Sequence, residues 1–152
     1  MVQIKCFGAI NNDLLDYFRH EVKSVSGPFE IIIDSPGGSV ASLEEIKKII
    51  AAHNGAVLGR VIGLAYSAAF DLLQECKTRT AARHSTLMFH APRLGGGYYV
   101  LIEDPCYLAL LEVLARRSGQ SMADLVSYGN SGRVFSAEEA LRLGFLDHIY
   151  DE

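Results

Sequence analysis

Residues 30–39 read EIIIDSPGGS, and this stretch decides the fold class. Three consecutive isoleucines form an uninterrupted β-branched run, which is typical of a strand buried on both faces of a parallel sheet. Two glycines follow, and such a turn exposes backbone amides at the carboxyl end of the strand. The apolar spacing of residues 40–53 then predicts a helix, with Ser42 and Glu45 as its capping box. Strand, glycine turn and helix in this order predict a βαβ unit.

The same alternation of strands and helices is expected along the rest of the chain. Gly63 is expected to end a strand, which places Ser67 at the start of a helix rich in small residues. No repeat or Pro/Gly-rich linker divides the 152 residues, so we expect one α/β domain over residues 1–152 with a mostly parallel sheet. The expected strands are 2–10, 30–34, 56–63, 87–90 and 145–150, and the expected helices are 11–24, 40–53, 67–76, 105–117, 121–127 and 136–143.

Composition argues against several classes of partner. The chain has 14 Lys and Arg against 18 Asp and Glu, and its basic residues are scattered, so no nucleic acid is expected. No apolar run is long enough to span a membrane and no signal-peptide pattern opens the chain, so we expect a cytoplasmic protein without a membrane partner. Cys6, Cys76 and Cys106 are widely spaced, which predicts packed thiols rather than disulfides or a metal site.

Three features are expected to meet at one edge of the sheet. Ser67, His90 and the turn of Gly37 and Gly38 each follow a predicted strand, and the carboxyl ends of neighbouring parallel strands share an edge. Taken singly, each has an ordinary explanation: a helix cap, a hydrogen-bonded structural histidine and a tight turn. Taken together, they predict a functional site.

Five segments resemble the ClpP-type serine peptidases, which have the ClpP/crotonase fold. The segments keep the family's order from about residue 31 to residue 147, and this order is more specific than any segment alone. They are SPGGSV at 35–40, GLAYSA at 63–68, MFHAP at 88–92, SGQS at 118–121, and SAEEA with GFLD at 136–147.

The resemblance implies both a fold and a mechanism. The fold consists of repeated βαβ units with a mostly parallel sheet, a handle segment at about 93–117 and C-terminal helices. In the mechanism, Ser67 is the nucleophile of a serine endopeptidase and His90 is its general base. The backbone amides of Gly38 and Ala68 form the oxyanion hole, and neither a metal nor another cofactor is required.

The third member of the family's triad, an aspartate, has no counterpart at its expected position. Counting without gaps from the SGQS segment places that aspartate on Gly132. Asn130 is a possible substitute, because an asparagine can orient an imidazole without supplying a charge. Otherwise an aspartate from elsewhere in the chain reaches the imidazole, or the site is weakened.

Partners are expected to be a peptide or unfolded protein substrate and further copies of the chain. The handle segment is shorter than the family's, and its glycines at 95–97 and apolar residues at 98–102 suggest a heptameric ring. The chain begins almost at its first strand, which does not favour docking to an AAA+ unfoldase. Short forms of this kind resemble the ClpP-like proteases of phage and prophage.

Two other classes of function compete with an oligomeric serine endopeptidase. One is a catalytically weak or inactive structural subunit, which the missing aspartate favours and the retained Ser67 and His90 oppose. The other is an acyl-CoA enzyme of the crotonase type, since that fold uses a similar two-amide oxyanion hole. It does not require a serine and a histidine at these spacings.

Overall fold

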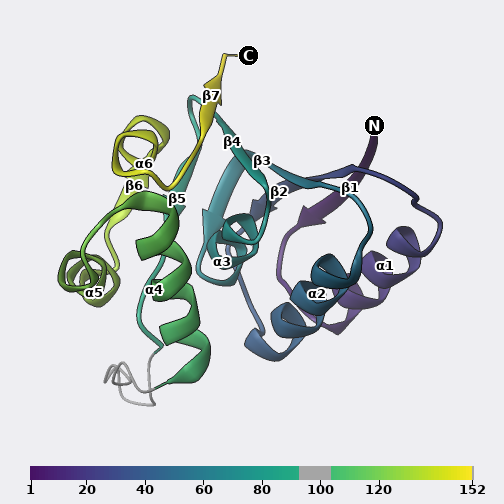
Figure 1. Cartoon of the computed structure of the whole chain (residues 1–152), viewed down its shortest axis with the longest axis horizontal. Coiled ribbons are helices and arrows are strands. Elements are labelled where there is room, and N and C mark those ends of the chain that lie inside the picture. The colour runs from purple at the N-terminus through teal and green to yellow at the C-terminus, as the bar shows by residue number, and fades with distance from the viewer. Residues whose placement is uncertain (93–103, 152) are drawn as a thin grey trace.

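The computed structural model describes residues 1–92 and 104–151. Figure 1 shows the strands at the centre, α1 and α2 together on one side, and α4, α5 and α6 on the other. The elements are β1 Val2–Phe7, α1 Asn12–Lys23, β2 Phe29–Ser35, α2 Val40–Ala52, β3 Val57–Tyr66, α3 Ala68–Gln74, β4 Thr78–Ala82, β5 Thr86–Met88, α4 Pro105–Ser118, α5 Met122–Ser131, β6 Val134–Ser136, α6 Ala137–Leu143 and β7 His148–Tyr150. None of the helices in the described part of the chain is long and apolar enough to cross a membrane.

The sheet is mostly parallel, as the isoleucine run predicted. Its strand order is β1-β2-β3-β4-β7, and each of these neighbours pairs in parallel. The first half of β3 pairs with β4 and its second half pairs in parallel with β5, which in turn pairs antiparallel with β6. The carboxyl ends of β2, β3 and β5 therefore come together, and the three predicted site segments begin there.

The prediction that Gly63 ends its strand is wrong. β3 continues through Gly63 to Tyr66, and a Cβ at Gly63 would collide with the carboxylate of Asp34, whose Cγ would lie 2.9 Å away. The Asp34 carboxylate accepts a hydrogen bond from the Leu64 amide at 3.0 Å. Glycine stands at this position to make room for a side chain on the neighbouring strand, and Ser67 follows the true end of β3.

The capping box predicted at Ser42 is also wrong. Ser39 is the N-cap of α2, and its hydroxyl accepts a hydrogen bond from the Ser42 amide at 3.1 Å. Ser42 lies inside the first turn, and its hydroxyl donates instead to the Asn12 side chain at 3.1 Å. The helix begins at Val40 because Ser39 is extended at φ −71° and ψ 123°, the conformation of an N-cap residue. The capping box predicted at Ser136 and Glu139 is confirmed in α6.

Two strands were not predicted. β4 carries few apolar residues, and β6 is only three residues long, so neither shows the periodicity that identifies a strand. The glycines at 95–97 and the apolar residues at 98–102 lie outside the described residues. The described part of the predicted handle is α4, whose range agrees with the predicted helix.

An aromatic core ties together the segments that carry the two candidate catalytic residues. The ring of Phe70 stacks on that of Phe89 with 5.0 Å between centroids, and both side chains are buried. Phe135 and Phe145 pack against Phe89 at 6.2 and 5.8 Å. Each such pair contributes about 0.5–1.5 kcal/mol beyond the area it buries. Because Phe70 follows Ser67 by three residues and Phe89 precedes His90, this packing restrains their relative positions.

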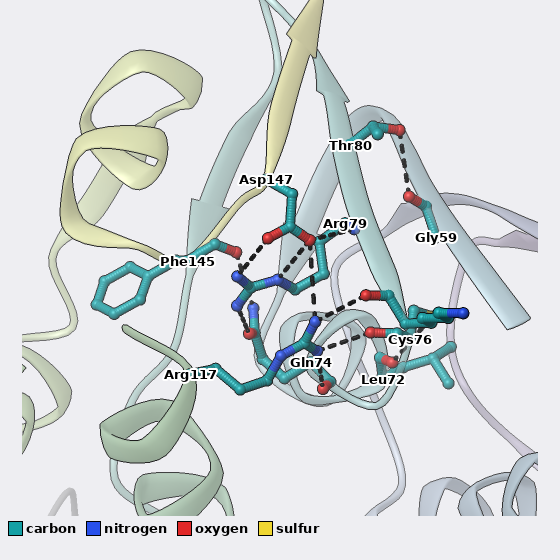
Figure 2. Close-up of polar contacts among 10 residues, drawn as sticks. Gly59, Leu72, Gln74, Cys76, Arg79, Thr80, Arg117, Phe145 and Asp147 are labelled. Carbon is teal, nitrogen blue, oxygen red and sulfur yellow. Dashed lines mark hydrogen bonds and ion pairs between the residues drawn. The ribbon is translucent and has the colours of Figure 1, made fainter. Parts of the chain in front are cut away.

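A buried polar network holds the far end of α3 against β4, α4 and the segment before β7 (Figure 2). The guanidinium of Arg79 is 3% exposed, pairs with the Asp147 carboxylate at 3.0 Å and donates to the Gln74 side chain at 2.7 Å. Gln74 donates in turn to the Phe145 carbonyl at 3.2 Å. Arg117, from α4, donates to the carbonyl oxygens at the end of α3 at 2.7 Å. Every strong donor in this network therefore has an acceptor.

We expect Asp147→Asn to lower the free energy of unfolding by about 2 kcal/mol at pH 7, because Arg79 is left buried without its counterion. Burial pushes the pKa of Asp147 up, but the hydrogen bonds and charge of Arg79 outweigh it and hold that pKa below 3.8. A depressed carboxyl pKa contributes stability above about pH 4, and this contribution is lost as the pH falls through the lowered value. Urea unfolding of both proteins from pH 7 to pH 3 should show the difference shrink.

Asp151→Asn is the matched control, because it breaks an Arg–Asp pair of which both partners are exposed. Exposed pairs contribute little, so its unfolding midpoint should stay close to that of the wild type. Equal effects of the two substitutions at pH 7 would contradict the importance of the buried network.

Candidate active site

Ser67 occupies the junction of β3 and α3 in a strained backbone conformation. Its φ is 58° and its ψ is −121°, and it is the only residue other than glycine with positive φ in the described part of the chain. Such a conformation costs about 1–3 kcal/mol and occurs mostly where function requires it. The Ser67 amide donates to the Met88 carbonyl at 2.8 Å, and its hydroxyl makes no capping hydrogen bond. Ser67 therefore occupies the N-cap position of α3 without capping the helix through its hydroxyl.

The glycine turn lies directly against Ser67. A Cβ at Gly37 would lie 2.9 Å from Ser67 Cβ and 3.1 Å from the Ala68 nitrogen, so only glycine fits there. The Gly37 amide donates to the Ser35 hydroxyl at 3.1 Å, and its carbonyl accepts from the Ile10 amide at 2.9 Å. The hydrogen bonds of this turn leave the Gly38 amide out, and the Ala68 amide, first in α3, has no intrahelical acceptor. Neither amide has a hydrogen-bond acceptor within the described part of the chain, so both donors are available beside Ser67.

The imidazole of His90 is oriented by a backbone carbonyl. Its Nδ1 lies 2.8 Å from the carbonyl oxygen of Ala91. A carbonyl can only accept, so Nδ1 carries the proton and the lone pair of the neutral ring resides on Nε2. In the described part of the chain no hydrogen bond yet joins His90 to Ser67, and bonds between catalytic groups are often long before substrate arrives. The carbonyl sets the tautomer that a general base needs, although it supplies no negative charge.

Gly132 lies beside His90, at the position where the sequence count placed the aspartate. A Cβ at Gly132 would lie 3.9 Å from His90 Cβ and would meet no closer atom. Gly132 has φ 63° and ends α5 as its left-handed C-cap. Asn130 is exposed, and no hydrogen bond from it to His90 is found in residues 1–92 and 104–151. The role suggested for Asn130 stays a prediction, and in this structure the Ala91 carbonyl, which sequence reasoning missed, contacts the imidazole.

A cavity of about 390 Å³ brings all four predicted site residues together. Its walls come from α2, α3, α4 and the segment that follows β5. The lining residues are Gly38, Val40, Leu43, Ser67, Ala68, Asp71, Phe89, His90, Pro92, Asp104, Cys106, Tyr107 and Leu110. This volume lies in the range of about 300–1,000 Å³ that is typical of ligand pockets.

The wall formed by α4 is fixed by Tyr107. Asp104 caps this helix by accepting from the Tyr107 amide at 3.0 Å, and the Tyr107 side chain is buried. Its hydroxyl occupies the space above Gly129, where any Cβ would collide with it. The Gly129 carbonyl accepts from the Ala91 amide at 2.9 Å, so α4, α5 and the His90 segment are held together at this point.

Asp71 is a cavity residue that sequence reasoning missed. It follows Ser67 by four residues in α3, is 7% exposed, and has its carboxylate 3.5 Å from the ammonium of Lys47. Burial raises the pKa of Asp71 to about 6, and Lys47 opposes this rise. The signal in the sequence was a lone carboxylate inside the apolar run AAFDLLQ, one helical turn after the serine.

Repeated strand–helix units with a mostly parallel sheet, and a serine at the end of one strand beside a glycine turn, define the ClpP/crotonase-like class of α/β protein. The chain belongs to the Clp protease family, whose model matches residues 18–152.

Curated relatives agree with this assignment. The chain is 35% identical over 153 residues to the ATP-dependent Clp protease proteolytic subunit 3 of Synechococcus sp. strain CC9605, covering 93% of this chain and 76% of the relative. It is 30% identical to the proteolytic subunit 2 of Tropheryma whipplei, covering 80% and 73%. The proteolytic subunit 2 of Rhodococcus jostii is 29% identical, with 82% and 68% covered.

Proposed function

We propose that the chain is a serine endopeptidase in which Ser67 is the nucleophile, His90 the general base, and the Gly38 and Ala68 amides the oxyanion hole. The observation that carries the proposal is the cavity on which these four residues converge. The family assignment supports peptidase activity, because the relatives are named as proteolytic subunits of Clp proteases. The strained backbone of Ser67 and its uncapped hydroxyl support the choice of nucleophile.

The proposed reaction proceeds through an acyl-enzyme. Ser67 Oγ attacks the substrate carbonyl carbon while its proton passes to Nε2 of His90, and the developing oxyanion accepts hydrogen bonds from the two amides. His90 then gives that proton to the leaving amine, and the C–N bond breaks. A water attacks the ester in the same manner, its proton passes to Nε2, and Ser67 Oγ is released with a proton returned by His90.

The Ala91 carbonyl replaces the usual carboxylate in this scheme. It holds Nδ1–H, so Nε2 is available as the acceptor throughout the cycle. A neutral carbonyl stabilises the imidazolium less than an aspartate does, so we expect a slow but functional enzyme. This arrangement favours an active peptidase over a silent subunit, because the orienting function of the third residue is retained.

A fluorophosphonate probe should label the wild-type protein at Ser67, because such probes react with serines activated by a base. Peptide mapping by mass spectrometry identifies the modified residue. Ser67→Ala should not be labelled, and Ser67→Gly is a second control, because glycine adopts positive φ without strain and should unfold at equal or higher urea concentration. Folded wild-type protein that stays unlabelled would refute the proposed nucleophile.

The oligomeric state, the substrate and the cellular location of the chain are proposals as well. The relatives' names describe subunits of ATP-dependent proteases, and this supports a homo-oligomer for the present chain. A heptameric ring, an unfolded protein substrate and a cytoplasmic location are proposed from the family resemblance. Native mass spectrometry of the full chain tests the ring, and a monomer at micromolar concentration would contradict it.

A further inference from the structure

The cavity beside Ser67 has apolar walls and also contains acidic side chains. Two carboxylates line it, those of Asp71 and Asp104, and the only nitrogen base in its described lining is His90. Val40, Leu43 and Leu110 supply apolar surface. A side chain that enters this cavity next to the reacting bond therefore meets both apolar walls and a buried carboxylate.

Asp71 is placed to interact with such a side chain. It lies one helical turn beyond Ser67, so both residues share the face of α3 that borders the cavity. α3 contacts both α2 and α4, and Lys47 of α2 lies 3.5 Å from the carboxylate. Asp71 is thus both buried and adjacent to the proposed nucleophile.

Lys47 does not neutralise the charge around Asp71. Its ammonium lies 3.5 Å from each of three carboxylates, those of Glu44, Asp71 and Glu75, and Lys47 is not itself in the cavity lining. Within residues 1–92 and 104–151, one cation against three anions leaves this cluster with an excess of two negative charges. Asp71 is the member of this cluster that lines the cavity, so its buried carboxylate is the one that attracts a second cation there.

We propose that Asp71 determines specificity, so that this cavity selects substrates with a lysine or arginine side chain at the residue whose carbonyl is attacked. The inference rests on the proposed peptidase function. The methylenes of a lysine side chain pack against Val40, Leu43 and Leu110, and its ammonium reaches the Asp71 carboxylate. An uncharged side chain of the same length makes the apolar contacts and leaves the Asp71 carboxylate with Lys47 as its one cationic partner among the described residues. The cation that the substrate adds is what a lysine side chain gains over such an analogue.

The preference of the cavity for a cationic side chain should depend on pH through the ionisation of Asp71. Burial raises the pKa of Asp71 to about 6, against the opposing charge of Lys47. The charged groups that act on it are Glu44 and Lys47 from α2 and Glu75 at the C-cap of α3. The other titratable groups that line the same cavity are His90, Asp104, Cys106 and Tyr107. Asp71 is charged above about pH 6 and neutral below it, so the preference for a cation should fall as the pH drops.

Two peptide diphenyl phosphonates that differ only in a lysine or a norleucine side chain test this proposal. Ser67 Oγ forms a bond to phosphorus and a phenoxide leaves, so the labelling rate reports both the nucleophile and the pocket. At pH 8 the lysine probe should react about tenfold faster than the norleucine probe, and the ratio should approach one at pH 5. Each ratio is taken within one protein at one pH, so the protonation of His90 cancels.

Variants separate a specificity role from a structural one. Asp71→Asn should bring the ratio at pH 8 to one or below. Lys47→Met removes the cation that lowers the pKa of Asp71, so the pH at which the ratio falls to one should move upward from its wild-type value. Asp16→Asn, at an exposed position, makes the same change of net charge and should leave the ratio unchanged. A wild-type ratio of one or less, or a ratio unmoved in folded Asp71→Asn, would overturn the inference. Loss of labelling by a simple fluorophosphonate would instead overturn the proposed function.

Discussion

Gly38→Ala is expected to lower kcat by about 10²–10³, the loss typical of one displaced oxyanion donor. A Cβ at this position would collide with the backbone carbonyl oxygen of Ile10 and lie 2.8 Å from its nitrogen. Backbone atoms cannot swing aside as a side-chain tip can, and φ of 154° at Gly38 already disfavours alanine. The turn must therefore shift, and the Gly38 amide moves away from the cavity.

Gly8→Ala is the matched control for this substitution. Gly8 also has positive φ, at 73°, but a Cβ there would meet no atom within 4 Å. It should carry the backbone cost of alanine, about 1 kcal/mol, with kcat unchanged. Both variants are assayed on a peptide substrate at a temperature where circular dichroism shows them folded. A folded Gly38→Ala protein with the kcat of Gly8→Ala would contradict the oxyanion role of the Gly38 amide.

Gly132→Asp is expected to raise kcat/KM by about tenfold to a hundredfold. The site for its Cβ is open and lies 3.9 Å from His90 Cβ, so a carboxylate on that carbon can approach Nδ1. The Ala91 carbonyl already sets the tautomer, so the gain consists of charge stabilisation of the imidazolium and is smaller than the roughly 10⁴ that a complete triad aspartate supplies. Aspartate tolerates the left-handed conformation of this C-cap better than most residues do.

Two controls separate charge from shape. Gly132→Asn has nearly the same shape without the charge and should leave kcat/KM within about threefold of the wild type. Gly119→Asp places a carboxylate at another left-handed C-cap, at the end of α4, where a Cβ meets nothing within 4 Å. It should change neither kcat nor KM. An equal response of Gly132→Asp and Gly132→Asn would mean that negative charge beside His90 is not what limits this site.

Local sequence patterns were sufficient to predict most of the helices and strands, and to identify the residues that line the candidate site. The isoleucine run of β2 predicted a parallel sheet because a strand covered by helices on both faces has no polar face to display. Ser67, His90 and the glycine turn were predicted to meet because parallel strands end at a common edge, and they do line one cavity. β4 and β6 were missed because short strands are stabilised by their neighbours in the sheet and need no periodicity of their own.

Sequence alone therefore determined the family, the parallel sheet and the set of residues proposed for catalysis, since these follow from residue type and order along the chain. Only the tertiary structure decided what lies beside His90, because a backbone carbonyl is present at every residue and the orientation of the one at Ala91 depends on the packed backbone. Tertiary structure likewise decided that Asp71 borders the cavity and that Lys47 pairs with Asp71 and Glu75, since these contacts join α2 to α3 and its C-cap across the fold.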